Sequence, residues 1–135
     1  MDNYFEFRVA LQQRTKQLAL RIIKLFQAIP KTNEADIIGK QLLRSSTSVG
    51  ANYRAACRAR SPKEFYSKLS IVIEEADETM YWIELLMDAN IIKASLLVDL
   101  LHENEEILKI IVSARKKYQE NQSKIKKNQS INQNS

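Results

Sequence analysis

The chain has 135 residues, with 21 Lys and Arg against 16 Asp and Glu, and it contains only two Gly, two Pro and one Cys. This length has room for one domain, and so few chain-breaking residues exclude a β-sandwich or β-barrel, which need many tight turns. A hydrophobic content of 44% is enough for one core. The single Cys, the lack of a secretory segment and the lack of an apolar run long enough to span a bilayer predict a cytoplasmic protein that contacts no membrane.

The first half of the chain shows the residue spacing of two long amphipathic helices. The first helix is predicted from about Phe5 to Ile29, and it ends there because Pro30 lacks a backbone donor. The second helix is predicted from about Glu34 to Ala59, and its small inward side chains indicate close approach by a neighbouring helix. These inward positions are Ile38, Leu42, Ser45, Val49, Asn52 and Ala56.

The second half begins with a strong helix-start signal. Ser61 is a suitable N-cap, Pro62 suits the first helical position, and Glu64 completes a capping box. This third helix is predicted to extend to about Ala89, with Asn90 as its C-terminal stop. A fourth helix follows from near residue 95.

The last residues differ in composition from the rest. Residues 121–135 are almost entirely Asn, Gln, Ser and Lys, which predicts a mobile, disordered basic and polar tail. Residues 1–120 hold four long helices joined by short loops, and such helices pack most simply side by side. The sequence therefore predicts an all-α, antiparallel up-down four-helix bundle with a mobile polar tail.

The charges are distributed unevenly along the chain. Residues 1–60 carry 11 basic and 4 acidic residues, whereas residues 61–90 carry 2 basic and 7 acidic residues. On a helical wheel, four cations of the second helix fall within an arc of about 80° opposite its apolar stripe. They are Lys40, Arg44, Arg54 and Arg58.

This row of cations supports two interpretations. A row of basic side chains on one rigid face can bind successive phosphates. This interpretation predicts a non-catalytic protein that binds nucleic acid, with structured RNA as the expected ligand. Arg60 and Lys63, in the adjoining loop, are weaker candidates for the same contact. Alternatively, the row is the solvated face of an amphipathic helix, or it contacts an acidic protein surface in an oligomeric scaffold or adaptor.

The third helix carries a second apolar face in addition to its core stripe. Ile71, Trp82 and Leu85 lie on this face, and aromatic anchors of this kind dominate protein interfaces. We therefore expect self-association through these residues. The alternative is that Trp82 only covers the edge of the core.

Residues typical of catalysis are missing. Phosphate-binding loops need glycines, and the chain has only Gly39 and Gly50, both inside the second helix. His102 is the only histidine, so the paired Glu-x-x-His ligands of a di-metal bundle cannot be assembled. We expect no enzyme activity, no catalytic residues, no metal and no cofactor.

The stretch from Gln41 to Leu86 resembles a known family. Its matching pieces include the run Val49-Gly50-Ala51-Asn52-Tyr53-Arg54, the pair Glu74-Glu75 and the pair Tyr81-Trp82. These resemble the bacterial four helix bundle protein family, related to proteins encoded by intervening sequences inside 23S ribosomal RNA genes. The resemblance implies a four-helix bundle that assembles into a homo-oligomeric ring, which is a pentamer in relatives.

Overall fold

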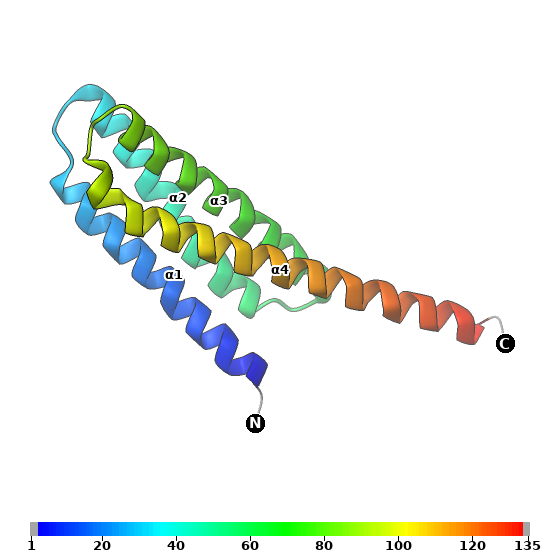
Figure 1. The fold of residues 1–135 in the computed structure, drawn as a ribbon. Helices are drawn as coiled ribbons and strands as arrows, with labels where there is room; N and C mark the ends of the chain where they lie inside the picture. The colour runs from blue at the N-terminus through cyan, green and yellow to red at the C-terminus, as the bar shows by residue number, and fades with distance from the viewer. Residues whose placement is uncertain (1–2, 134–135) are drawn as a thin grey trace.

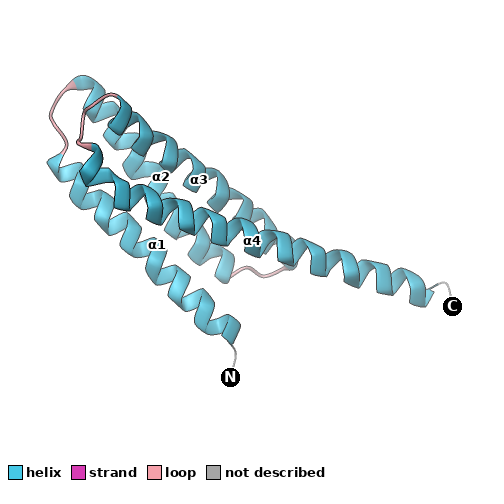
Figure 2. Cartoon of the chain, viewed as in Figure 1, coloured by secondary structure: helices cyan, strands magenta, loops and turns pink. Residues whose placement is uncertain are grey.

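Four helices make up nearly all of the protein in the computed structural model, which describes residues 3–133. They are α1 (Asn3–Ala28), α2 (Asn33–Cys57), α3 (Pro62–Asp88) and α4 (Ala94–Gln133). Successive helices run up and down beside one another (Figure 1). Figure 2 shows that only short loops join them and that residues 3–133 contain no strand. The predicted all-α, antiparallel four-helix bundle is confirmed.

Capping side chains and backbone conformation explain where the helices begin and end. The Thr32 side chain accepts a hydrogen bond from the Ala35 N–H at 3.3 Å at the start of α2, and Ser61 accepts one from Glu64 at 3.1 Å at the start of α3. These bonds satisfy N–H groups that have no partner inside the helix. Asn90 follows α3 with a φ of 55°, in the left-handed region that Asn tolerates. The predicted boundaries of α3 are therefore confirmed to within one residue.

One core runs between the four helices. The largest fully buried apolar side chains come from all of them, and they are Leu18, Ile22, Leu42, Val49, Leu69, Val72, Ile83, Leu86, Leu97, Ile107 and Ile111. The buried face of α2 is displaced from the predicted one: Ile38 and Asn52 are only half-buried, whereas Gly39 and Tyr53 are buried. At Gly39 the displacement reflects close packing of α1, because a Cβ added there would lie 3.2 Å from Phe26 Cδ2.

Polar side chains from all four helices are buried inside the bundle. They are Thr15, Ser45, Ser46, Thr79 and Asn104, each with 0% exposure. The hydroxyls of Thr79 and Ser45 lie 2.9 Å apart, and Asn104 Nδ2 donates to the Ala76 carbonyl at 2.9 Å. Such bonds between helices are lost if one helix slides along another, so they help to fix the register of the bundle.

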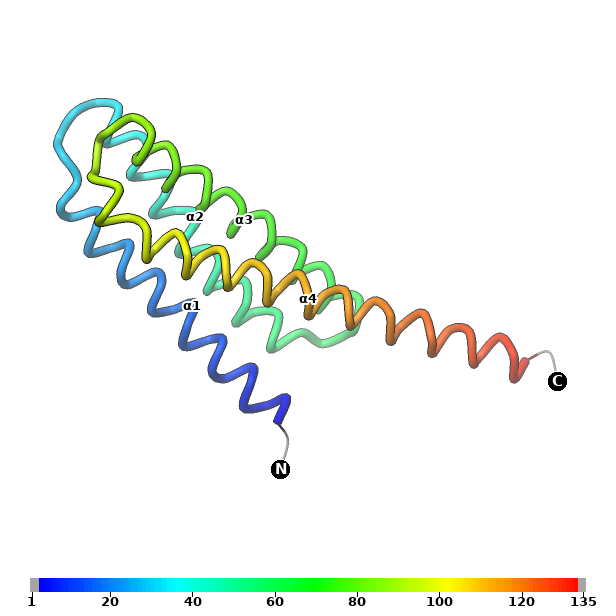
Figure 3. The backbone as a smooth tube through the Cα atoms, viewed as in Figure 1, coloured from blue at the N-terminus to red at the C-terminus, as the bar shows by residue number. Residues whose placement is uncertain are grey.

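Helix α4 is much longer than the others, with 40 residues. At a rise of ~1.5 Å per residue it measures about 60 Å, and its C-terminal part projects beyond the other three helices (Figures 1 and 3). The predicted disordered tail therefore differs from the structure, in which residues 121–133 are helical and residues 134–135 lie outside the described part. Residues 121–133 contain no Gly or Pro, so nothing in the sequence stops a helix that the bundle has already nucleated.

Removing residues 121–135 is expected to leave the stability of the bundle unchanged. All described side chains from residue 119 onward are exposed except that of Gln122, which is half-buried, so the segment contributes almost nothing to the core. We expect the free energy of unfolding in urea to change by less than about 0.5 kcal/mol, the usual range for surface changes, while the helical circular dichroism signal falls. A loss of several kcal/mol in the free energy of unfolding would show that the projecting part of α4 packs against another part of the protein.

Candidate nucleic-acid interface

The four cations predicted to line α2 all have exposed side chains, but two of them are already paired. Lys40 Nζ lies 2.9 Å from Asp36 Oδ2, one turn earlier on the same helix. Arg44 forms ion pairs with Glu75, at 3.2 Å, and with Glu78 of α3. The first half of the predicted row thus has counter-charges within the chain, whereas Arg54 and Arg58 form no ion pair with any residue from 3 to 133.

The pairing of Arg44 follows from the packing of α2 against α3, which is the most extensive helix contact in the bundle. A helical wheel shows that Arg44 points away from its own core stripe, but not that a neighbouring helix presents two carboxylates beside it. The hydrogen bond that Arg44 donates to Glu78 raises the pKa of Arg44. Arg44 thus connects α2 to α3 and is a poor candidate for a nucleic-acid contact.

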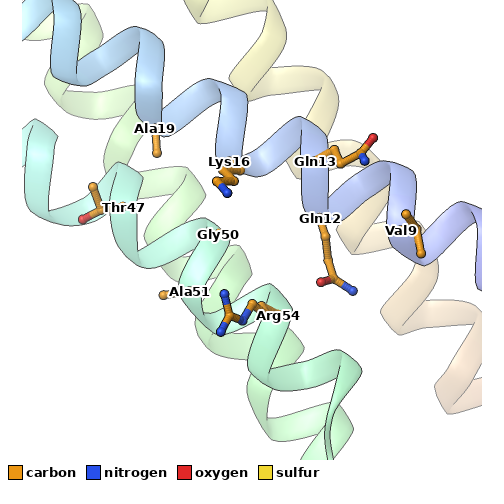
Figure 4. A pocket seen from close by; sticks show the side chains of 9 residues that line it. All are labelled: Val9, Gln12, Gln13, Lys16, Ala19, Thr47, Gly50, Ala51 and Arg54. Atoms are coloured by element: carbon orange, nitrogen blue, oxygen red, sulfur yellow. The ribbon is translucent and has the colours of Figure 1, made fainter.

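Arg54 instead points into a groove between α1 and α2. The groove has a volume of about 460 Å³ and is lined by Val9, Gln12, Gln13, Lys16, Ala19, Thr47, Gly50, Ala51 and Arg54. Figure 4 shows Gln12 reaching from α1 toward α2, Lys16 on the side of α1 that faces α2, and Arg54 lying along α2 with its guanidinium toward Ala51. None of the nine lining residues is acidic. The groove is therefore a positively charged site built from two helices.

Small residues of α2 give the groove its shape. A Cβ added at Gly50 would lie 3.5 Å from the Thr15 carbonyl oxygen, so α1 and α2 pass close to each other at this level. Ala51 and Thr47 continue the same narrow surface, and they leave the long side chains of Lys16 and Arg54 room to reach over it. The small size of the α2 side chains, noted from the sequence, is thus explained in part by this close contact.

Lys16 and Arg54 have no counter-charge of their own. Among residues 3–133, neither side chain forms an ion pair or a hydrogen bond. Two like charges that face one cavity repel each other, and an anion between them removes that repulsion. Lys16 was not predicted as a contact residue, because a search along one helix does not combine cations from two helices.

The remaining predicted cations lie farther along, near the end of the bundle where α2 meets α3. Arg58 caps α2 with its backbone N–H, which donates to the Ala55 carbonyl at 3.1 Å, and its side chain is exposed. Arg60 and Lys63 follow in the loop and in the first turn of α3, also exposed. These three side chains can extend a charged surface beyond Arg54, but none of them lines the groove.

Other cations of α1 have structural partners. Arg14 Nη2 lies 2.6 Å from Glu103 Oε1 and 3.0 Å from Glu106 Oε1, both on α4. The Arg14 hydrogen bond lowers the pKa of Glu103. Since α1 and α4 make the least extensive contact of the neighbouring helix pairs, this cluster is a principal link between them. The sequence offered no signal for it, because the partners are almost 90 residues apart.

The predicted interface residues of α3 are only half-exposed. Ile71, Trp82 and Leu85 are all half-buried, and Trp82 packs against the core. Its neighbour Tyr81 is 55% exposed and meets Trp82 edge-to-face, with ring centroids 5.0 Å apart. The most exposed aromatic residue on this helix is therefore Tyr81, which was not among the predicted interface residues.

Two further structural findings concern metal binding and membrane-spanning helices. Within the described residues, no three His, Cys, Asp or Glu side chains come together in a way that could hold a metal ion. None of the helices between residues 3 and 133 has an apolar stretch long enough to cross a bilayer. His102 is exposed on α4, as expected from its position on the helical wheel.

Comparison with known proteins identifies the family. The profile of the 23S rRNA-intervening sequence proteins matches residues 8–113, most of the chain. The protein belongs to this family. The resemblance seen between Gln41 and Leu86 is thereby confirmed.

A member of the S23 ribosomal protein family from Bacteroides thetaiotaomicron, solved as a protein of unknown function, has a similar structure. It is 34% identical, with a TM-score of 0.76, and the match covers 81% of this chain and 97% of that one. No curated protein matches the sequence.

Proposed function

We propose that this 23S rRNA-intervening sequence protein is a non-catalytic, homo-oligomeric protein that binds structured RNA through the groove between α1 and α2. The observation that supports the proposal is the pair Lys16 and Arg54, which face one cavity that has no acidic residue in its lining. Backbone phosphates bound at these two side chains would supply the missing counter-charges.

Each part of the groove has a role in holding a phosphate. The Arg54 guanidinium can donate two parallel hydrogen bonds to phosphate oxygens, and Lys16 adds a compact point charge. The amide of Gln12, which also points toward α2, supplies a neutral donor. Gly50 and Ala51 lack bulky side chains, so a sugar-phosphate backbone can approach the helix closely. No aromatic residue lines the groove, so recognition depends on shape and charge.

The charges elsewhere set the orientation of the bound RNA. Several carboxylates are exposed on α3: Glu74, Asp77, Glu84 and Asp88. They repel phosphates, whereas Arg54 and Arg58 attract them on the other side of α2. The RNA is therefore placed along α1 and α2, away from α3, and repetition of the groove around an oligomer would increase affinity through multivalency.

A salt series tests this function. The affinity of the protein for a structured RNA duplex is measured by fluorescence anisotropy at increasing NaCl concentration. If phosphates dominate, the logarithm of the association constant falls linearly with the logarithm of the salt concentration, with a slope of about −0.9 for each phosphate contact by analogy with duplex DNA. A slope near zero, or an absence of binding at low salt, would refute the proposal.

A second candidate function, a scaffold or adaptor for a protein partner, is favoured by the opposite charges of the bundle's faces. The acidic surface of α3 surrounds the exposed Tyr81 ring and is complementary to the basic surface of α1 and α2. A second copy of the chain could join these surfaces in a ring, such as the pentamer implied by the resemblance. In that case Ile71, Trp82 and Leu85 would form part of the contact, and the groove would be partly covered.

Sedimentation velocity distinguishes a monomer from this assembly. We expect the wild-type protein to sediment as an oligomer at micromolar concentration. Tyr81→Asp is expected to shift the protein to monomer, because it removes the exposed aromatic ring at the contact and leaves in its place a charged group that is costly to bury. Leu96→Asp is the matched control on α4, where Leu96 is 67% exposed. Sedimentation of the wild type as a monomer would contradict the oligomer, and equal effects of both substitutions would exclude Tyr81 from its interface.

A further inference from the structure

We infer that a second cavity, at the end of the bundle where α2 meets α3, binds a small molecule that combines a planar aromatic ring with an anionic group. The cavity has a volume of about 330 Å³, within the range of ~300–1,000 Å³ that is usual for small-molecule sites. Its lining comes from all four helices and the α2–α3 loop: Tyr4, Arg8, Ala56, Cys57, Ala59, Arg60, Ser61, Pro62, Phe65 and Tyr118. It shares no lining residue with the groove between α1 and α2.

Aromatic rings form one part of this cavity. Phe65 and Tyr118 meet edge-to-face, with ring centroids 5.1 Å apart, and the Tyr4 ring lies under the Arg8 guanidinium at 5.5 Å. Flat apolar surfaces of this kind accept a planar ring by stacking or edge contact. The groove on α1 and α2 has no such rings, so the two cavities suit different chemistry.

Two arginines form another part. Arg8 uses one Nη2 donor on the Cys57 carbonyl, which fixes its guanidinium at the cavity and leaves its other N–H groups available. The Arg60 side chain forms no ion pair or hydrogen bond with any residue from 3 to 133. No acidic side chain is among the ten lining residues. The site therefore offers two cationic groups to an anion, and the nearby Glu64 carboxylate is engaged by the Arg60 backbone N–H at 3.1 Å and not by either guanidinium.

The Tyr118 hydroxyl provides a third and independent observation. Its oxygen is buried and has no hydrogen-bond partner within the described residues. A buried polar group without a partner is costly, and most such groups in folded proteins are satisfied. Burial also raises the pKa of Tyr118, so the hydroxyl remains a donor at neutral pH. A small shift of the side chains that cover it would let this hydroxyl donate to a ligand oxygen in the cavity.

Adenosine monophosphate is a suitable probe, because it joins a planar ring to a phosphate. We expect it to bind the full-length protein in a ¹H–¹⁵N NMR titration and to shift the backbone signals of residues 56–65 most strongly. Adenosine, which lacks the anion, and inorganic phosphate, which lacks the ring, are each expected to bind at least about tenfold more weakly, since each loses one set of contacts. Equal binding of phosphate alone would overturn the requirement for a ring.

Two variants locate the binding and separate it from RNA binding. Tyr118→Phe keeps the ring and removes only the hydroxyl, and it is expected to weaken adenosine monophosphate binding about tenfold, the effect of one charge-assisted hydrogen bond. Lys16→Gln with Arg54→Gln is expected to leave that affinity unchanged while RNA binding is lost. The inference is overturned if millimolar adenosine monophosphate shifts no signal, if Tyr118→Phe binds it like wild type, or if the shifts map to Lys16 and Arg54.

Discussion

Replacing Lys16 and Arg54 together by Gln is expected to weaken the binding of structured RNA about a hundredfold at low salt. Each side chain loses a charge-assisted contact to phosphate worth about 1.5 kcal/mol, and two such losses amount to about two powers of ten. The plot of the logarithm of the association constant against the logarithm of the salt concentration should also become less steep, by the share that two phosphate contacts contribute. Fluorescence anisotropy with one RNA at several salt concentrations measures both quantities.

A matched control separates the groove from the net charge of the protein. Lys31→Gln with Lys93→Gln removes the same two charges from the exposed loops at the other end of the bundle. We expect this variant to lose less than about threefold in affinity, because surface charges far from the RNA act only through screened, long-range attraction. Similar losses in the two double variants would mean that binding follows overall charge and that the groove has no special role.

Replacing Leu18 by Ala is expected to destabilise the bundle by about 2–5 kcal/mol, the range for removal of a large aliphatic side chain from a packed core. Leu18 is 0% exposed and lies in the centre of the buried face of α1. The loss combines the lost transfer of apolar surface from water with the cavity that remains. For a domain with a typical stability of ~5–15 kcal/mol this is a large fraction of the total.

The same substitution two residues later provides the control. Leu20 is 47% exposed on the outer face of α1, so Leu20→Ala is expected to change the free energy of unfolding by less than about 0.5 kcal/mol. Urea unfolding followed by circular dichroism compares the two variants. Equal losses for Leu18→Ala and Leu20→Ala would show that the outer face of α1 is covered in solution, as in a tight oligomer, or that its orientation differs from the one described.

The features predicted well from the sequence are those governed by local chemistry and by helical periodicity. Ser61 and Pro62 mark the start of α3 because an N-cap and a helix-initiating proline act within one turn. The inward positions predicted at Leu42, Ser45 and Val49 of α2 are buried because a helix repeats every 3.6 residues. Both signals are contained in short stretches of chain.

The features that could not be predicted depend on contacts between helices. A wheel shows the direction of Arg44 but not the carboxylates of Glu75 and Glu78 on the neighbouring helix. The groove likewise needs Lys16 from α1 and Arg54 from α2, which come together only when Gly50 lets the helices approach. The length of α4 was underestimated because a polar composition indicates poor packing, and a helix can continue without packing once the bundle has formed.

The most direct test of the proposed interface is an NMR titration of ¹⁵N-labelled protein with a short structured RNA. We predict that the strongest backbone shifts fall on the residues that line the groove, around Lys16 on α1 and around Gly50 and Arg54 on α2, and that α3 between Glu74 and Asp88 is unaffected. Shifts confined to the projecting part of α4, or shifts centred on α3, would contradict the account.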